Sequence, residues 1–364
     1  MSNTIGKNIC VTLFGESHGT AIGAVLDGLS PGVSVDEAFI SSQLEKRKPK
    51  GKTGTARREG DEFQILSGVF NGKTNGAPLC LVIFNQSAKS SDYEKLKDLP
   101  RPGHADYTAE IKYAGFQDYR GGGHFSGRLT APLVAVGAIA ISALKEKGIF
   151  IGTHVKKCAG IADRDFSNLT CDLEKLNASD FAVLDDEKAI LMQQAIEKAA
   201  AEGDSVGGVL ETAVTGLTAG LGEPWFDSLE SVFSHYLFSI PAVKGVEFGL
   251  GFAFADKKGS EANDAFRSEG GKIITATNNN GGINGGLTNG MPLLFRCVIK
   301  PTPSIYKEQN TVNLQTKENT TLKIEGRHDP AIVHRARIVV DSLVALALCD
   351  QIFARYGENY LATK

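Results

Sequence analysis

The order of the predicted strands and helices is the feature that most constrains the fold of this chain. Stretches rich in β-branched and aromatic residues predict strands over residues 9–14, 62–70 and 79–84. Periodic apolar residues and capping signals predict long helices over residues 130–147 and 331–354. Strands and helices therefore occur in runs, without the regular alternation of a parallel sheet, and this favours an α+β fold. Because no linker-like stretch divides the chain, we expect a single domain over residues 1–364.

Bulk composition narrows the class of protein. The chain has 39 Lys and Arg against 42 Asp and Glu, and the net charge of −3 argues against nucleic-acid binding by overall electrostatics. The longest apolar run, 129–144, is interrupted by Pro132 and Gly137 and is shorter than the about 20 residues of a membrane span, so it predicts a buried helix. No signal-peptide pattern opens the sequence, and the six cysteines lack zinc-binding spacing. We expect a cytoplasmic protein with reduced thiols, no bound metal and no membrane contact.

Local signals predict three further features. Ser34, followed three residues later by Glu37, has the spacing of a capping box, which places a helix N-terminus at Ser34. The segment 162–184 has mixed character and is expected to form a surface excursion. His235 lies in a helix with an apolar face and is expected on the protein surface rather than at a ligand.

The strongest positive run covers residues 46–58 and includes Arg47, Lys52 and Arg57. Three interpretations compete: a flap over an anionic ligand, a solvated loop, or a localisation or nucleic-acid-binding patch. Glycine and threonine among the charges favour the flap. The lack of interleaved aromatic residues argues against stacking on bases.

Two short loops between residues 101 and 128 concentrate glycine, arginine and histidine. Consecutive glycines free backbone N–H groups to face an anion, arginine binds phosphate and carboxylate, and histidine exchanges protons near neutral pH. The combination indicates a site for an anionic ligand and for proton transfer. The polar residues of these loops are Arg101, His104, Asp106, Arg120, His124, Ser126 and Arg128.

Other loops add candidates of the same kind. Ser17 and His18 follow the predicted strand 9–14, Asp329 lies in the segment 326–330, and a second glycine-rich loop covers 278–286. The segment 68–74 fails the spacing of a P-loop, and no Gly-x-Gly-x-x-Gly opens a helix after a strand. The residues alone therefore indicate a protein that binds and transforms a small molecule with several negative groups.

Taken together, these motifs resemble the chorismate synthase family across nearly the whole chain. The matching segments are 14–19 (Phe-Gly-Glu-Ser-His-Gly), 27–28, 101–106 (Arg-Pro-Gly-His-Ala-Asp), 119–123 (Tyr-Arg-Gly-Gly-Gly), 126–128 (Ser-Gly-Arg), 220–224, 242–247, 281–282, 285–286, 300–302 and 326–330 (Gly-Arg-His-Asp-Pro).

The resemblance implies a fold in which helices lie between antiparallel β-sheets, and a homotetramer. It also implies an anti-1,4-elimination of phosphate from 5-enolpyruvylshikimate 3-phosphate to give chorismate. The reaction requires reduced FMN although it has no net redox change. The substrate carries a phosphate and two carboxylates, which matches the excess of arginine in the loops.

The resemblance assigns roles to individual residues. His18 is similar to the family histidine that protonates the departing phosphate, with Ser17 as a relay. His104 is similar to the histidine that protonates the reduced flavin, with Ser126 as its relay. Asp329 is similar to the group that acts when the C6 hydrogen leaves.

The remaining carried-over residues bind the two ligands. The residues that resemble flavin contacts are His124, Phe125, Ser126, Pro241, Ala242, Gly285, Lys300, Pro301, Thr302, Pro303, Ser304 and Arg327. The residues that resemble clamps for the anionic groups are Arg47, Arg57, Arg101, Arg128 and Arg327.

A few positions depart from the commoner family pattern. His124 and Phe125 stand where many members have Arg and Ser, and Pro241 stands where Asn is usual. No separate nicotinamide motif is present, so we expect that the chain does not reduce its own flavin with NADPH.

Two rival hypotheses remain: a non-catalytic phosphate- or RNA-binding protein that uses residues 46–58, and a flavoenzyme with net redox chemistry.

Overall fold

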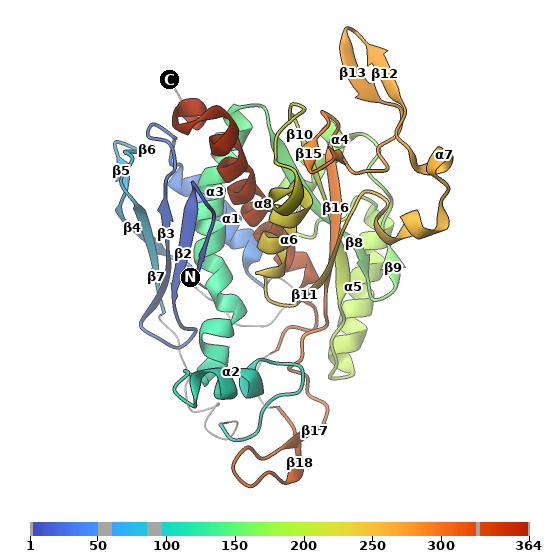
Figure 1. Cartoon of the computed structure of the whole chain (residues 1–364). Helices are drawn as coiled ribbons and strands as arrows, with labels where there is room; N and C mark the ends of the chain where they lie inside the picture. Colours follow the sequence, from blue (N-terminus) through green and yellow to red (C-terminus); the bar gives the residue numbers. More distant parts are fainter. Residues whose placement is uncertain (1–2, 50–59, 86–96, 325–327, 363–364) are drawn as a thin grey trace.

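The computed structural model describes residues 3–49, 60–85, 97–324 and 328–362, and its centre is a layer of helices between two antiparallel sheets (Figure 1). The first sheet has the strand order β1-β2-β3-β7-β4 and the second has the order β11-β16-β10-β8-β9. The strands of the first sheet are β1 (Thr4–Ile5), β2 (Cys10–Gly15), β3 (Ala21–Asp27), β4 (Phe63–Ser67) and β7 (Leu79–Phe84). The strands of the second are β8 (Phe150–Cys158), β9 (Ile161–Ala162), β10 (Gly208–Thr215), β11 (Val243–Phe248) and β16 (Leu293–Ile299).

The helical layer joins the two sheets through its two longest members. Helix α3 (Thr130–Glu146) packs along α8 (Val333–Tyr356), and α1 (Glu37–Arg47) contacts both. Helix α3 also contacts β3 and β7 of the first sheet, whereas α8 contacts β8 and β10 of the second. Helix α6 (Leu229–Phe238) covers α8 and β11. The predicted α+β sandwich of helices between antiparallel sheets is confirmed.

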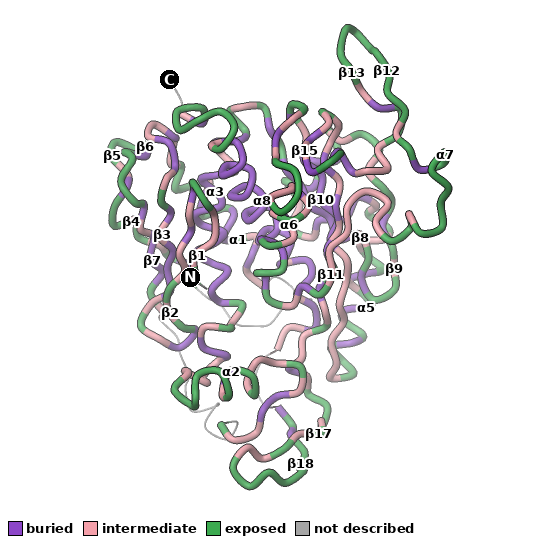
Figure 2. Tube along the Cα trace, in the orientation of Figure 1, coloured by how far each residue is buried: buried purple, intermediate pink, exposed green. Residues whose placement is uncertain are grey.

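The crossing of α3 and α8 depends on one glycine. A Cβ atom at Gly137 would lie 2.3 Å from Cβ of Ser342, well inside van der Waals contact. Glycine therefore lets the two helix backbones approach closely. Figure 2 shows buried residues along both helices, and the exposed fraction of side chains such as Val134 and Leu343 is 0%.

The apolar stretch Gly127–Glu146 is long and apolar enough to cross a membrane by composition alone. However, 83% of its most apolar window is buried inside the protein. The prediction of a buried core helix is therefore confirmed, and its N-terminal end leads directly from the glycine-rich loop.

Smaller elements surround this core. Hairpin β12–β13 projects from the body and is exposed along most of its length (Figures 1 and 2). The remaining strands are β5 (Val69–Phe70), β6 (Lys73–Thr74), β12 (Phe266–Glu269), β13 (Lys272–Thr275), β14 (Ile283–Asn284), β15 (Leu287–Thr288), β17 (Gln309–Val312) and β18 (Asn319–Leu322). The remaining helices are α2 (Asp106–Tyr113), α4 (Leu169–Ala178), α5 (Asp186–Ala201) and α7 (Gly259–Ala262).

Two local predictions were wrong. The N-cap of α1 is Asp36 and not Ser34, because the Asp36 carboxylate accepts a hydrogen bond from Phe39 N at 3.0 Å. Ser34 instead forms a β-bridge with Lys73. The segment 162–184 contains helix α4, which buries Leu173 and Leu176 and is therefore more than a surface excursion.

Candidate active site

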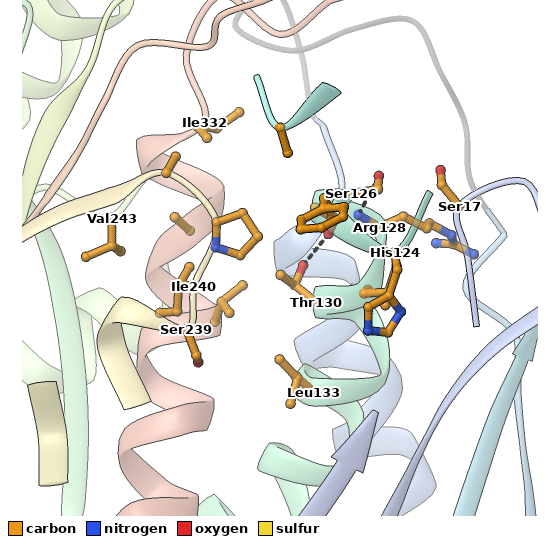
Figure 3. A pocket seen from close by; sticks show the side chains of 18 of the residues that line it. Ser17, His124, Ser126, Arg128, Thr130, Leu133, Ser239, Ile240, Val243 and Ile332 are labelled. Carbon is orange, nitrogen blue, oxygen red and sulfur yellow. Dashed lines mark hydrogen bonds between the residues drawn. The ribbon is translucent and has the colours of Figure 1, made fainter. Parts of the chain in front are cut away.

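A cavity of about 960 Å³ lies where the helical layer meets the loops rich in glycine, arginine and histidine, and its walls come from distant parts of the chain. Figure 3 shows His124, Ser126 and Arg128 on one wall, facing Ile240, Val243 and Ile332 on the other. The predicted site residues that line it are Ser17, Arg47, His104, His124, Phe125, Ser126, Arg128, Pro241, Ala242, Lys300, Thr302, Pro303, Ser304 and Asp329.

The glycines that follow Arg120 place two histidines beside the cavity. Gly121, Gly122 and Gly123 all have positive φ, at 57°, 84° and 53°. A Cβ at Gly121 would lie 2.2 Å from Cε1 of His18, and a Cβ at Gly122 would lie 3.1 Å from Cε1 of His104. The two histidines therefore pack against adjacent residues of one backbone segment, and glycine is needed for His18 to fit.

Ser17 and His18 are held by this same loop. Ser17 N donates a hydrogen bond to Gly123 O at 3.1 Å, and Ser17 Oγ would lie 3.0 Å from a Cβ at Gly121. His18 is buried and does not itself line the cavity, but it contacts Gly121, which does. The residues that follow strand β2 of the first sheet therefore pack directly against the glycine segment 121–123.

His104 is fixed by a carboxylate and an arginine. Its Nδ1 lies 2.7 Å from Oδ1 of Asp106, and Arg101 bonds both oxygens of that carboxylate, each at 2.7 Å. Burial alone would raise the pKa of Asp106, but the hydrogen bonds from Arg101 and His104 outweigh it and hold that pKa far below its ordinary value. Nδ1 of His104 is therefore occupied by Asp106. Nε2 of His104 would lie 3.3 Å from a Cβ atom at Gly122, and Cβ of Ser126 would lie 3.8 Å from the same point.

A second carboxylate joins two of the predicted clamp arginines. Oδ2 of Asp61 accepts a hydrogen bond from Arg47 Nη2 at 3.0 Å, and Oδ1 of Asp61 accepts one from Arg128 Nη1. All three side chains are buried. Burial opposes ionisation of Asp61, but the charges of Arg47 and Arg128 outweigh it and lower the pKa of that carboxyl. Sequence reasoning missed Asp61, since nothing local marks it as the partner of two distant arginines.

Asn85 was also missed, and it links Arg128 to the loop that carries His18. Its Oδ1 accepts from Arg128 Nε at 3.3 Å. Its Nδ2 donates to the carbonyl oxygens of Glu16 and Gly19 at 3.1 and 2.9 Å. The position of Asn85 immediately after the strand β7 was the only available signal.

The facing wall combines polar and apolar groups. Ala242 has the unusual φ of 75°, and its carbonyl oxygen accepts a hydrogen bond from Lys300 N at 2.9 Å. Lys300 Nζ donates to Gly103 O, which ties this wall to the loop of His104. The buried hydroxyl of Thr302 has no hydrogen-bond partner within the described part of the chain. A ligand in the cavity would supply one.

His124 and Phe125 stand at the edge of the cavity. Nδ1 of His124 lies 2.8 Å from Gly15 O, and Nε2 lies 3.2 Å from Oδ1 of Asn3. Phe125 packs beside Tyr113 with 6.1 Å between ring centroids. Two of the residues that depart from the usual family pattern therefore line the cavity. His235 lines it as well and is exposed, as predicted.

The other predicted residues lie around or outside the cavity. Arg101 contributes through His104, as described above. Gly285 lies in the turn between β14 and β15 and does not line the cavity, and neither does Pro301. Arg57 and Arg327 lie outside the residues that the structure describes.

Comparison with known proteins identifies the family. A family model described as chorismate synthase matches residues 9–353. The chain belongs to the chorismate synthase family. A chorismate synthase from Thermococcus gammatolerans is 46% identical over 351 residues, which cover 96% of this chain and 97% of the relative. One from Chitinophaga pinensis is 46% identical over 357 residues, with 98% of each chain covered.

A solved chorismate synthase structure shares the fold. It matches with a TM-score of 0.75 at 30% identity, and covers 97% of this chain and 94% of that one. As a member of this family, the chain is an enzyme of the lyase class, which eliminates phosphate from 5-enolpyruvylshikimate 3-phosphate to give chorismate for aromatic amino-acid biosynthesis. The comparisons do not support the alternative of a non-catalytic phosphate- or RNA-binding protein.

Proposed function

We propose that the cavity is the active site of this reaction and that it holds the substrate together with reduced FMN. The observation that carries the proposal is the packing of His18 and His104 against the neighbouring residues Gly121 and Gly122. One proton-transfer group, His104, thereby lines the cavity, and a second, His18, packs directly against Gly121 of the cavity wall. A volume of about 960 Å³ is at the upper end for small-molecule sites, which suits two ligands.

The residues around the cavity fit a flavin. Apolar side chains such as Leu133 and Ile240 can pack against a ring system, while Lys300 and the hydroxyl of Thr302 offer donors for its polar groups. His124, Phe125, Ser126, Pro241, Ala242, Pro303 and Ser304 would complete this binding surface, and Gly285, Pro301 and Arg327 remain predicted contacts. When bound, reduced FMN supplies transient electron transfer to an elimination that has no net redox change.

The substrate is bound through its anionic groups. Arg47 and Arg128 lie in the cavity wall with buried guanidinium groups, and both bond the carboxylate of Asp61. A phosphate or carboxylate of the substrate would bind at these two guanidinium groups, because arginine bonds such anions through paired N–H donors. Arg57, Arg101 and Arg327 are proposed to assist at the remaining negative groups.

The proposed proton transfers are those that the family resemblance implies. His18 protonates the departing phosphate, with the Ser17 hydroxyl as a relay. His104 gives a proton from Nε2, because Nδ1 is occupied by Asp106, and Ser126 is proposed as its relay. Asp329 accepts a proton at its carboxylate when the C6 hydrogen leaves.

Anaerobic phosphate release from 5-enolpyruvylshikimate 3-phosphate tests the proposal. We expect release only when reduced FMN is present, with catalytic amounts of FMN sufficient for many turnovers and no stoichiometric consumption of reductant. Phosphate release without flavin, or one reductant consumed per turnover, would overturn the proposed cofactor role. Omission of NADPH should make no difference when FMN is reduced beforehand, but oxidised FMN with NADPH should remain inactive.

The domain organisation, location, assembly and partners complete the proposal. The whole chain functions as one domain, since the cavity is lined by residues from Asn3 to Leu343. By resemblance to the family the enzyme is a cytoplasmic homotetramer that binds no nucleic acid. Sedimentation analysis of the purified protein tests the assembly, and a monomer that is fully active would refute it.

A further inference from the structure

Arg335 lies in the first turn of α8 and lines the cavity, but neither the motifs nor the family resemblance gave it a role. Its Nη1 forms an ion pair with Oδ2 of Asp329, and its Nε donates a hydrogen bond to the backbone carbonyl of Arg47 at 2.7 Å. The side chains of Arg335 and Asp329 are each 16% exposed. One guanidinium therefore joins two residues that come from different walls of the site.

The position of Arg335 in its own helix does not explain its presence. The first turn of α8 reads Val-His-Arg-Ala, and the N-terminal end of a helix carries a partial positive charge. A cation there is slightly unfavourable for the helix. The reason for an arginine must therefore lie in its contacts outside α8, and both of the contacts given above lead to the site.

The contact with Arg47 has a clear physical basis. Arg47 is the last residue of α1, so its carbonyl oxygen belongs to the group that has no partner within the helix. A cation near a helix C-terminus is favourable. The side chain of the same residue bonds Asp61 in the cavity wall. Arg335 thus supports the end of the helix that presents a clamp arginine.

We infer that Arg335 is a positioning residue that holds the Asp329 carboxylate at the cavity and couples it to the C-terminal end of α1. This inference rests on the proposed role of Asp329 in proton transfer. The forked guanidinium suits the task because it bonds a carboxylate and a carbonyl oxygen at once in a fixed geometry. A small displacement of an acid–base group can lower a rate by about 10²-fold.

A double-mutant cycle with Arg335→Ala and Asp329→Asn tests the inference. Because Arg335 acts on the orientation of Asp329, we expect Arg335→Ala to lower kcat by about 10- to 100-fold while KM changes by less than about threefold. The double variant should be at most about threefold slower than Asp329→Asn alone, because the second change has nothing left to orient. Arg355→Ala, on the exposed end of the same helix, is the matched control and should retain full activity.

Chemical rescue separates positioning from a general loss of structure. Added methylguanidine should restore part of the kcat of Arg335→Ala and none of that of Asp329→Asn. Arg335→Lys should remain impaired, since one ammonium cannot replace the fork. If Arg335→Ala does not fold, Arg335→Met keeps the apolar stem and removes the donors, and the same cycle applies.

The outcomes distinguish the inference from the proposal beneath it. Near-wild-type turnover of Asp329→Asn would remove Asp329 from its proposed role. A slow Asp329→Asn together with an Arg335→Ala variant as active as the Arg355→Ala control would refute the positioning role alone. Fully multiplicative effects in the double variant would show that Arg335 does not act through Asp329.

Discussion

Two of the arginine–aspartate clusters at the cavity differ in composition. In the first, Asp106 binds one arginine and one histidine, Arg101 and His104. In the second, Asp61 binds two arginines, Arg47 and Arg128. The carboxylate of the first cluster bonds Nδ1 of His104 and therefore orients a group that can transfer protons. The second cluster places two guanidinium groups in the cavity wall, and guanidinium groups suit the binding of phosphate and carboxylate.

The comparison assigns kinetic consequences to each cluster. A group that orients a proton donor should affect kcat, whereas a group that binds the substrate anion in the ground state should affect KM. Mutations in the first cluster should therefore lower kcat, whereas mutations in the second should raise KM.

The largest effect is expected at the histidine that the first cluster holds. His104→Ala removes the proton donor, so kcat should fall by about 10²-fold or more while KM stays within a few-fold. Steady-state kinetics under anaerobic conditions, with reduced FMN in excess, provides the measurement. Near-normal turnover would exclude His104 as an acid–base group and would remove the contrast between the clusters.

The second-largest loss of activity is expected in the second cluster, in which Asp61 binds two arginines. Arg128→Ala deletes a charge-assisted contact of about 1.5–3 kcal/mol, so kcat/KM should fall by about 10- to 100-fold, chiefly through a higher KM. Asp61 would retain Arg47, which preserves part of the cluster. Arg164→Ala is a suitable control, since Arg164 pairs with Asp172 and neither residue lines the cavity. A loss confined to kcat would contradict the binding role.

A smaller effect is expected when only the support of His104 is weakened. Asp106→Asn keeps the shape and the possibility of one hydrogen bond to Nδ1 but removes the charge. We expect kcat to fall by about tenfold, less than for His104→Ala, with KM nearly unchanged. A loss larger than that of His104→Ala, or a further loss when Asp106→Asn is added to His104→Ala, would show that Asp106 does not act only through His104.

The smallest effect concerns stability in acid. The pKa of Asp106 is held below its unfolded value of about 3.9, so its ion pair stabilises the fold above that pH and the contribution is lost as the pH falls through the lower, folded pKa. The free energy of unfolding of wild type should therefore exceed that of Asp106→Asn near pH 6, and the difference should shrink as the pH falls toward 3. Denaturant unfolding at several pH values measures it, and a constant difference would contradict the linkage.

Local patterns were sufficient to predict several core elements. The strand Leu79–Phe84 and the helix from Thr130 lie where composition and caps placed them. The N-cap of α1 was misplaced because Ser34 and Asp36 are both good capping residues two positions apart, and the chain begins its helix only after Asp36, whose carboxylate accepts from Phe39 N. Tertiary contacts decide between two such capping residues, here the β-bridge of Ser34 with Lys73.

Contacts in the site could be predicted where both residues belong to one short motif. They could not be predicted where the two residues are far apart in the sequence. His104 and Asp106 lie two residues apart, so their contact is encoded locally. Asp61 and Arg128 are separated by 67 residues, and Arg335 and Arg47 by 288, so no local pattern marks these pairs. The contact between His18 and Gly121 could not be predicted either. It forms only because the loop after strand β2 packs against the glycine segment 121–123 in the folded protein.

The span of the cavity lining has a consequence for biosynthesis of the protein. Its walls include Asn3 near the start and Val339 and Leu343 within the last helix, and α8 lies between both sheets. A nascent chain on the ribosome therefore cannot complete this cavity until α8 has emerged and has packed against α3. A polypeptide terminated before α8 would lack Val339 and Leu343 of the cavity wall and the helix that contacts β8 and β10, and we expect it to be inactive.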